Sequence, residues 1–211
     1  VQAWPCWWNA HCAKHKADMS TTHAMFNSEA ERTVVEDTQR WLMQAVVGLN
    51  LCPFAKSVVV KSMVRYVVCL SPEPEDVLAM LRTELTHLRD ADPDTLDTTL
   101  LIAPHLLPDF FAFNQFLDAC DAVLQDLELD GVLQVADFHP RYQFGDAQES
   151  DISNYTNRAP YPTLHLLREA SIDRAVEAFP DAAEIFERNI ALLHQLGQEG
   201  WQALGIQARV S

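Results

Sequence analysis

The order of helical and strand-like segments is the feature of this sequence that most restricts its fold. Apolar residues recur with helical spacing over residues 28–49, 73–89, 109–127 and 171–196. Runs typical of strands occupy residues 58–70, 98–103, 132–138 and 163–167. Helices that alternate with strands in this way predict an α/β (or α+β) fold. We expect a single domain with a central sheet of about four strands and helices packed on it.

Local signals place the ends of the first helix. Ser28 is followed three residues later by Glu31, which is the pattern of a capping box. The helix should end between Gly48 and Asn50, because Pro53 disfavours helical geometry at the residue before it and cannot continue the hydrogen-bond ladder.

Three further boundaries follow from residue type. The β-branched residues of 58–70 predict a strand, bent near residues 61–63. Ser171 is a suitable N-cap for a helix that runs to Phe179. Gly197 is a suitable C-cap for the helix that precedes it.

Residues 1–28 differ from the rest of the chain because they show no clear periodicity. This segment contains possible zinc ligands at Cys6, His11, Cys12 and His15. Their spacing matches no standard zinc finger, and no second ligand pair follows. We therefore expect residues 1–28 to be a disordered N-terminal appendage and residues 29–211 to form the α/β domain.

The charge balance excludes some classes of partner. The chain has 15 Lys and Arg against 30 Asp and Glu, a net charge of −15, which repels nucleic acids and anionic lipids. Every apolar run is interrupted by charge before the roughly 20 residues that a bilayer requires, so we expect no membrane partner. Five cysteines at irregular spacing, with no secretory signal, indicate a reducing compartment, the cytoplasm.

The long polar segment of residues 139–162 follows a predicted strand, where α/β proteins place functional loops. Its aromatic residues favour an ordered loop. His139 begins this segment and His165 follows it, and a histidine pKa near neutrality suits a general acid or base. We predict His139 and His165 as catalytic residues, although each could instead be a structural histidine that bonds a backbone carbonyl.

Two arginines are candidates for binding an anion. Arg158 and Arg168 each present a planar fork that matches a carboxylate or a phosphate. The side chains that we expect to orient such a substrate are Tyr142, Gln143, Asn154 and Asn157. The alternative for Arg158 is that it pairs with an acid of the same loop and holds the loop in place.

Cys52 is the one cysteine that we consider as a possible nucleophile. Cys52 has apolar neighbours and lies beyond the C-terminal end of a helix, and both features disfavour a thiolate. We predict a structural role for it. The sequence contains no phosphate-binding loop, no zinc-protease motif and no nucleophile elbow, so it identifies no cofactor and no metal site.

Three longer motifs resemble a known family. They are Gly48-Leu49-Asn50-Leu51-Cys52-Pro53-Phe54-Ala55, Phe138-His139-Pro140-x-Tyr142-Gln143-Phe144, and Asn154-Tyr155-Thr156-Asn157-Arg158-x-Pro160-Tyr161-Pro162-x-Leu164-His165-Leu166-Leu167-Arg168-Glu169. The chain resembles a family of bacterial proteins of roughly 180 residues, an ordinary length for one domain, known as a domain of unknown function. The resemblance covers about residues 30–196 and implies no activity, substrate or catalytic residue.

Three functional hypotheses are compatible with these residues. The first is an enzyme that acts on a small anionic metabolite, which Arg158 and Arg168 bind while His139 or His165 moves a proton. The second is a non-catalytic module that binds or senses a small molecule in the same pocket. The third is a metalloprotein that uses His139 and His165.

Overall fold

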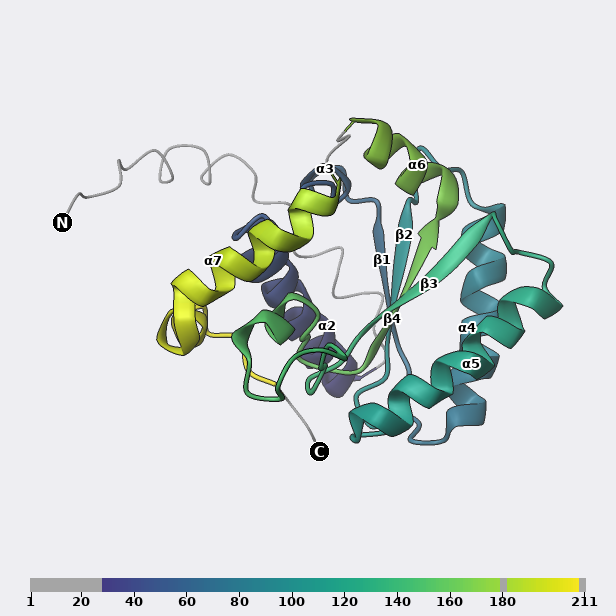
Figure 1. Cartoon of the computed structure of the whole chain (residues 1–211). Helices are drawn as coiled ribbons and strands as arrows, with labels where there is room; N and C mark the ends of the chain where they lie inside the picture. The colour runs from purple at the N-terminus through teal and green to yellow at the C-terminus, as the bar shows by residue number, and fades with distance from the viewer. Residues whose placement is uncertain (1–27, 179–181, 209–211) are drawn as a thin grey trace.

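The computed structural model describes residues 28–178 and 182–208 (Figure 1). The predicted appendage lies outside the described residues, apart from Ser28, and so do the possible ligands Cys6, His11, Cys12 and His15. Phe179, where the helix capped by Ser171 was predicted to end, also lies outside them.

The centre of the fold is a four-stranded mixed sheet. Its strands lie in the spatial order β1 (Val64–Val68), β2 (Thr98–Ile102), β4 (Thr163–Arg168) and β3 (Leu133–Phe138). Strands β1 and β2 are parallel, whereas β4 is antiparallel to both β2 and β3. The predicted α/β class and the predicted four strands are confirmed.

Two long helices cover one face of the sheet. Helix α4 (Pro74–Asp90) forms the crossover that the parallel pair β1–β2 requires, and α5 (Phe110–Asp126) leads to β3. Figure 1 shows both helices on the same side of the sheet. Their apolar sides meet alternate strand residues in one core, which includes the buried side chains of Leu81, Leu85, Phe113, Leu101, Leu164 and Leu166.

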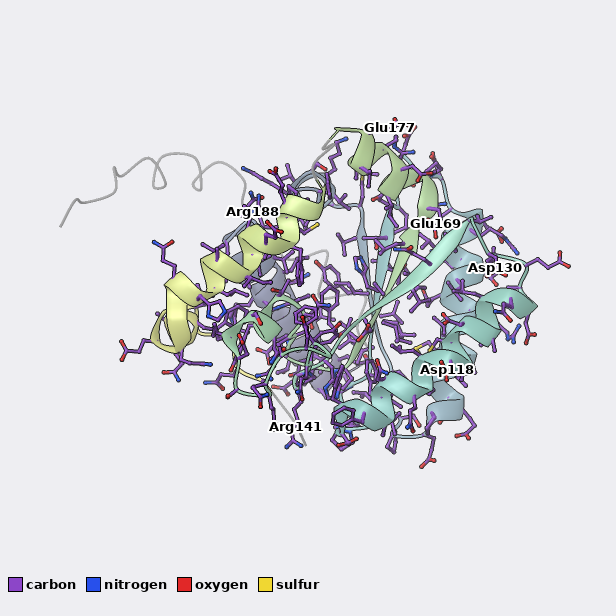
Figure 2. The ribbon with its side chains drawn as sticks, in the orientation of Figure 1. Asp118, Asp130, Arg141, Glu169, Glu177 and Arg188 are labelled. Carbon is purple, nitrogen blue, oxygen red and sulfur yellow. The ribbon has the colours of Figure 1, made fainter. Side chains whose placement is uncertain are left out.

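The remaining helices lie on the side of the sheet away from α4 and α5 (Figure 1). They are α2 (Glu29–Trp41), the π-helical turn η1 (Leu42–Val47), α3 (Ala55–Val60), α6 (Glu169–Ala178) and α7 (Ala182–Ala203). The 3-10 helix η2 (Ile152–Thr156) lies in the long polar loop and packs against α7. Acidic side chains such as Asp118, Asp130 and Glu177 project outward from the surface (Figure 2).

The predicted start and end of the first helix are confirmed. The Glu31 amide donates to the Ser28 hydroxyl at 3.2 Å, and the Ser28 amide donates to the Glu31 carboxylate at 3.1 Å. These reciprocal bonds form the capping box. The helical segment ends at Gly48, and Asn50 follows it with a φ of 55°.

The predicted strand over residues 58–70 is correct only in its second half. Val58, Val59 and Val60 belong to helix α3, and the strand begins at Val64. Val58 and Val59 turn toward the interior of the protein, and Val59 packs against the core formed by α2 and η1. This packing outweighs the preference of β-branched residues for strands. A tight turn with Ser62 at a φ of 58° then separates the two elements.

One predicted helix boundary is wrong and one is confirmed. Ser171 does not cap α6, because α6 begins at Glu169 directly after β4, and the Ser171 hydroxyl bonds Asp97 Oδ1 at 2.6 Å instead. Gly197 has non-helical backbone angles with a φ of 65°, as predicted for a C-cap glycine, and a further short helical segment follows it to Ala203.

Candidate functional site

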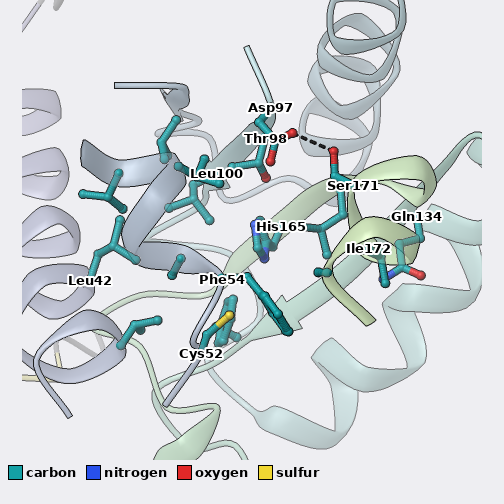
Figure 3. A pocket seen from close by; sticks show the side chains of 18 of the residues that line it. Leu42, Cys52, Phe54, Asp97, Thr98, Leu100, Gln134, His165, Ser171 and Ile172 are labelled. Carbon is teal, nitrogen blue, oxygen red and sulfur yellow. Dashed lines mark hydrogen bonds between the residues drawn. The ribbon is translucent and has the colours of Figure 1, made fainter. Parts of the chain in front are cut away.

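A pocket of about 330 Å³ lies between the sheet and the helices α3 and α6 (Figure 3). Its floor is made of strand residues Val64, Thr98, Leu100, Gln134, Phe138, His165 and Leu167. Its walls come from α2 and η1 (Trp41, Leu42, Val46), from α3 and the loop before it (Cys52, Phe54, Ala55, Val58, Val59), and from α6 (Ser171, Ile172, Ala175, Val176). Asp97 completes the lining. A volume near 300 Å³ and a mostly apolar lining are typical of small-molecule sites.

The pairing of the strands determines which side chains reach the floor. His165 lies opposite Leu100 on one side and Ala136 on the other, and Leu167 lies between Thr98 and Gln134 in the same way. Because side chains two residues apart in a strand share a face, these side chains all rise toward α3 and α6. The small side chain of Ala136 leaves space beside the His165 ring.

His165 is the titratable histidine of the pocket. Its ring stacks on Phe138 with centroids 5.8 Å apart, and Phe138 packs edge-on against Trp41 at 4.9 Å. The ring makes no hydrogen bond with any other residue that the structure describes. Burial lowers the pKa of His165 to about 4. The imidazole is therefore neutral at physiological pH and offers one donor and one acceptor.

Most other polar groups of the pocket are already engaged. The Thr98 hydroxyl donates to the Leu166 carbonyl at 2.6 Å, and Ser171 is bonded to Asp97. The Gln134 carboxamide makes no hydrogen bond with the rest of the described chain. Among residues 28–178 and 182–208, no lysine or arginine lines this pocket. Its polar surface is therefore small and, apart from Asp97, uncharged.

His139 lies on the opposite face of the sheet. Its ring packs between Phe110 and Phe113 of α5, with centroids 5.5 and 5.0 Å away. One ring nitrogen, Nδ1, accepts a bond from the Arg141 amide at 3.0 Å, and Nε2 lies 3.2 Å from the Leu107 carbonyl oxygen. The side chain is fully buried, and this burial lowers its pKa to about 4. Both nitrogens are thus occupied by the backbone.

Arg158 is bonded to the polar loop itself. Its Nε donates to the Tyr142 carbonyl at 3.0 Å and its Nη2 to the Glu149 carbonyl at 2.8 Å. The guanidinium lies 4.7 Å from the centre of the Tyr155 ring, in cation–π contact. These bonds connect two parts of the loop through backbone carbonyls, whereas the sequence suggested acidic side chains as the partners.

Arg168 lies at the other end of β4, far along the strand from Arg158. Its Nη2 donates to the carbonyls of Leu88 and Ala91 at 2.6 and 2.9 Å, and its Nε donates to the Leu96 carbonyl at 3.2 Å. The carbonyls of Leu88 and Ala91 belong to the end of α4, which the helix itself leaves without donors. Arg168 therefore supplies hydrogen-bond donors to the carbonyl groups at the C-terminus of α4.

The four predicted orienting residues belong to the polar loop. Asn154 is fully buried; its oxygen accepts the Phe144 amide at 3.0 Å and its nitrogen donates to the Gln148 carbonyl at 2.8 Å. Gln143 donates to the Ala147 carbonyl at 2.8 Å. The Asn157 carbonyl accepts the amide of His139 at 3.2 Å, and its side chain is hydrogen-bonded to the Tyr142 hydroxyl.

The structure thus brings together only part of the predicted site. His139, Tyr142, Gln143, Asn154, Asn157 and Arg158 gather in the loop, where they bond to one another or to the backbone. His165 lines the pocket, and Arg168 lies at the end of α4. Gln134 and Asp97, which also line the pocket, were not predicted, although period-two alternation places Gln134 on the same face as Phe138.

The described residues offer neither a cluster of metal ligands nor a membrane-spanning helix. No three His, Cys, Asp or Glu side chains in this part of the chain lie close enough together to hold a metal ion. None of its helices has both the length and the apolar character needed to cross a membrane.

Comparison with known proteins gives one match. No curated protein and no solved structure matches the chain. A family model described as "Protein of unknown function (DUF1415)" matches residues 33–203, a range that contains all four strands and every residue of the pocket. The chain therefore belongs to this family.

Proposed function

We propose that the protein is a small-molecule-binding module, and that its ligand is a mostly apolar, uncharged molecule held in the pocket between the sheet, α3 and α6. The observation that carries this proposal is an apolar cavity of about 330 Å³ whose floor contains a neutral histidine. Such a cavity stabilises a ligand chiefly by removing its apolar surface from water.

The composition of the pocket argues against an anionic ligand. Burying an anion without a cationic partner is costly, and the described lining offers Asp97 but no lysine or arginine. The two arginines considered for this role, Arg158 and Arg168, donate to backbone carbonyls instead.

The protonation state of His165 favours binding over acid–base catalysis. A general base is most effective when its pKa lies near the working pH. Burial lowers the pKa of His165 to about 4, so its neutral form is a weak base. Among the three hypotheses, the non-catalytic binding module therefore agrees best with the geometry.

Fluorescence of the neutral dye N-phenyl-1-naphthylamine tests this proposal, because the dye becomes bright in apolar cavities. We expect the full chain to bind it at one site. Ala175→Phe places a ring in the pocket wall and should weaken binding at least tenfold, which corresponds to about 1.4 kcal/mol.

Ala79→Phe is the matched control, because Ala79 lies on the exposed side of α4, beyond the opposite face of the sheet. This variant should bind the dye as the wild type does. Equal binding by both variants, or no binding by the wild type, would contradict the proposed function.

A further inference from the structure

Two polar side chains on neighbouring strands line the floor of the pocket. They are His165 on β4 and Gln134 on β3. The register pairs Ala136 with His165 and Gln134 with Leu167, so His165 and Gln134 are diagonal neighbours on the same face of the sheet. Diagonal neighbours lie about 7–8 Å apart at the backbone, which is within reach of long side chains. Figure 3 shows both among the side chains that line the cavity.

These two groups complement each other chemically. A neutral imidazole has one donor and one acceptor, and a carboxamide has both kinds of atom. Neither is hydrogen-bonded elsewhere in the part of the chain that the structure describes, whereas Thr98, Asp97 and Ser171 have partners. An apolar ligand that left the two groups without partners would impose a desolvation cost on each.

We propose that the ligand carries an uncharged amide group at one end of an apolar body, with the amide bound between His165 and Gln134. This inference rests on the proposed function and names the chemical class of its ligand. An amide N–H donates to one of the two side chains while its carbonyl accepts from the other. The cavity of about 330 Å³ has room for roughly ten groups of the size of a water molecule, at about 30 Å³ each.

Other head groups satisfy the pair less well. A carboxylate only accepts, and it would also be repelled by Asp97, which lines the same pocket. An ester accepts but donates nothing, so one acceptor on the protein stays without a partner. The amide is therefore distinguished from groups of nearly the same size by its donor.

A series with one carbon chain tests the inference. Octanamide, methyl octanoate and octanoate compete with N-phenyl-1-naphthylamine for the full-length protein at neutral pH. We expect octanamide to bind about tenfold more tightly than methyl octanoate, which is the effect of one hydrogen bond to a group that is otherwise unsatisfied. Octanoate should bind most weakly.

Variants then identify the groups responsible. His165→Leu and Gln134→Met should each reduce the ratio of octanamide affinity to methyl octanoate affinity to threefold or less. Both affinities are measured on the same variant, so a change in dye affinity does not alter this ratio. If the wild type binds octanamide no more tightly than methyl octanoate, the inference is overturned whether or not the variants fold. In that case, binding of the dye by the wild type still supports the proposed function. A preference that survives both substitutions overturns it as well. Failure of the wild type to bind the dye overturns both.

Discussion

The imidazole rings of His139 and His165 lie on opposite faces of one sheet, each packed against phenylalanine. His139 contacts Phe110 and Phe113 on the side of α5, and His165 contacts Phe138 on the side of α2. Because the sheet separates them, no single metal ion or substrate atom can touch both rings. The two residues must therefore be tested separately, although the sequence suggested them for one site.

Stability should fall in mild acid because of these two histidines. Burial lowers both pKa values to about 4, whereas a histidine in the unfolded chain titrates near 6.5. Between these values the unfolded state binds protons that the folded state does not. Each histidine should therefore lower the free energy of unfolding by up to about 1.4 kcal/mol per pH unit as the pH decreases, and this effect should fade within about one pH unit above 6.5.

Urea unfolding at several pH values between neutral and about 5 measures this slope. His165→Leu should remove close to half of it. The control is Thr83→Val, because Thr83 lies exposed on α4 and has no titratable group, so its replacement should leave the slope unchanged. A slope that stays the same in His165→Leu would show that the ring is already accessible to protons in the folded state.

Arg158→Lys should destabilise the free protein. Lysine keeps the charge but cannot donate in a planar fork to the carbonyls of both Tyr142 and Glu149. We expect a loss of about 1–2 kcal/mol, a decrease of roughly 3–6 °C in the melting temperature of a chain of this length. Arg89→Lys is the control, since Arg89 is exposed and its side chain is hydrogen-bonded to the neighbouring Asp90. An unchanged melting temperature for Arg158→Lys would favour anion binding as its role.

Arg168→Gln should have a larger effect. This change removes three bonds to carbonyls, two of which come from the end of α4. We expect a loss of about 2–3 kcal/mol, and faster amide hydrogen exchange in the last turn of α4 than in α5. Small anions should not restore stability. Restoration by phosphate or a dicarboxylate would instead support the anion site that the sequence suggested.

Cys52 should react with iodoacetamide in the folded protein, and a ligand in the pocket should slow this reaction. Its side chain lines the pocket and is partly accessible, whereas Cys69 and Cys120 are buried, and burial raises the pKa of Cys120 to about 12. Peptide mapping of a Cys6→Ser, Cys12→Ser protein should find label at Cys52 alone. Saturation with N-phenyl-1-naphthylamine should protect it.

Cys52→Ala should bind the dye with less than a twofold change, as expected of a thiol that only packs in the wall. Abolished dye binding at an unchanged melting temperature would assign the thiol a direct part in ligand recognition.

The regular elements of this fold could be predicted because their signals are local. The capping box at Ser28 and Glu31 and the apolar periodicity of α4 and α5 lie within single segments of sequence. Helix α3 could not be predicted in this way, because Val58 and Val59 have strand propensity and only their packing in the folded protein makes them helical.

The candidate site depended on non-local information. The polar loop has the residue types of an active site, but Asn154 and Arg158 use their hydrogen bonds to hold the loop together. Composition alone does not separate these two uses. Gln134 and His165 share one face of the sheet because β3 pairs with β4, two strands separated by that loop. The register of this pairing could not be predicted from the sequence.

The π-helical turn over residues 42–47 makes the pocket sensitive to a change of a single codon. The Gly48 amide donates to the carbonyl of Met43, five residues back, at 3.0 Å, so this turn is wider than a turn of α-helix. Deleting exposed Gln44 would restore α-helical bonding and rotate the end of this helical segment and the loop after it by about 100° around the helix axis. Cys52 and Phe54 would then face a new direction while the sheet stayed intact. Gain or loss of one residue here is thus a route by which relatives could reshape the wall of the pocket and exchange one ligand for another.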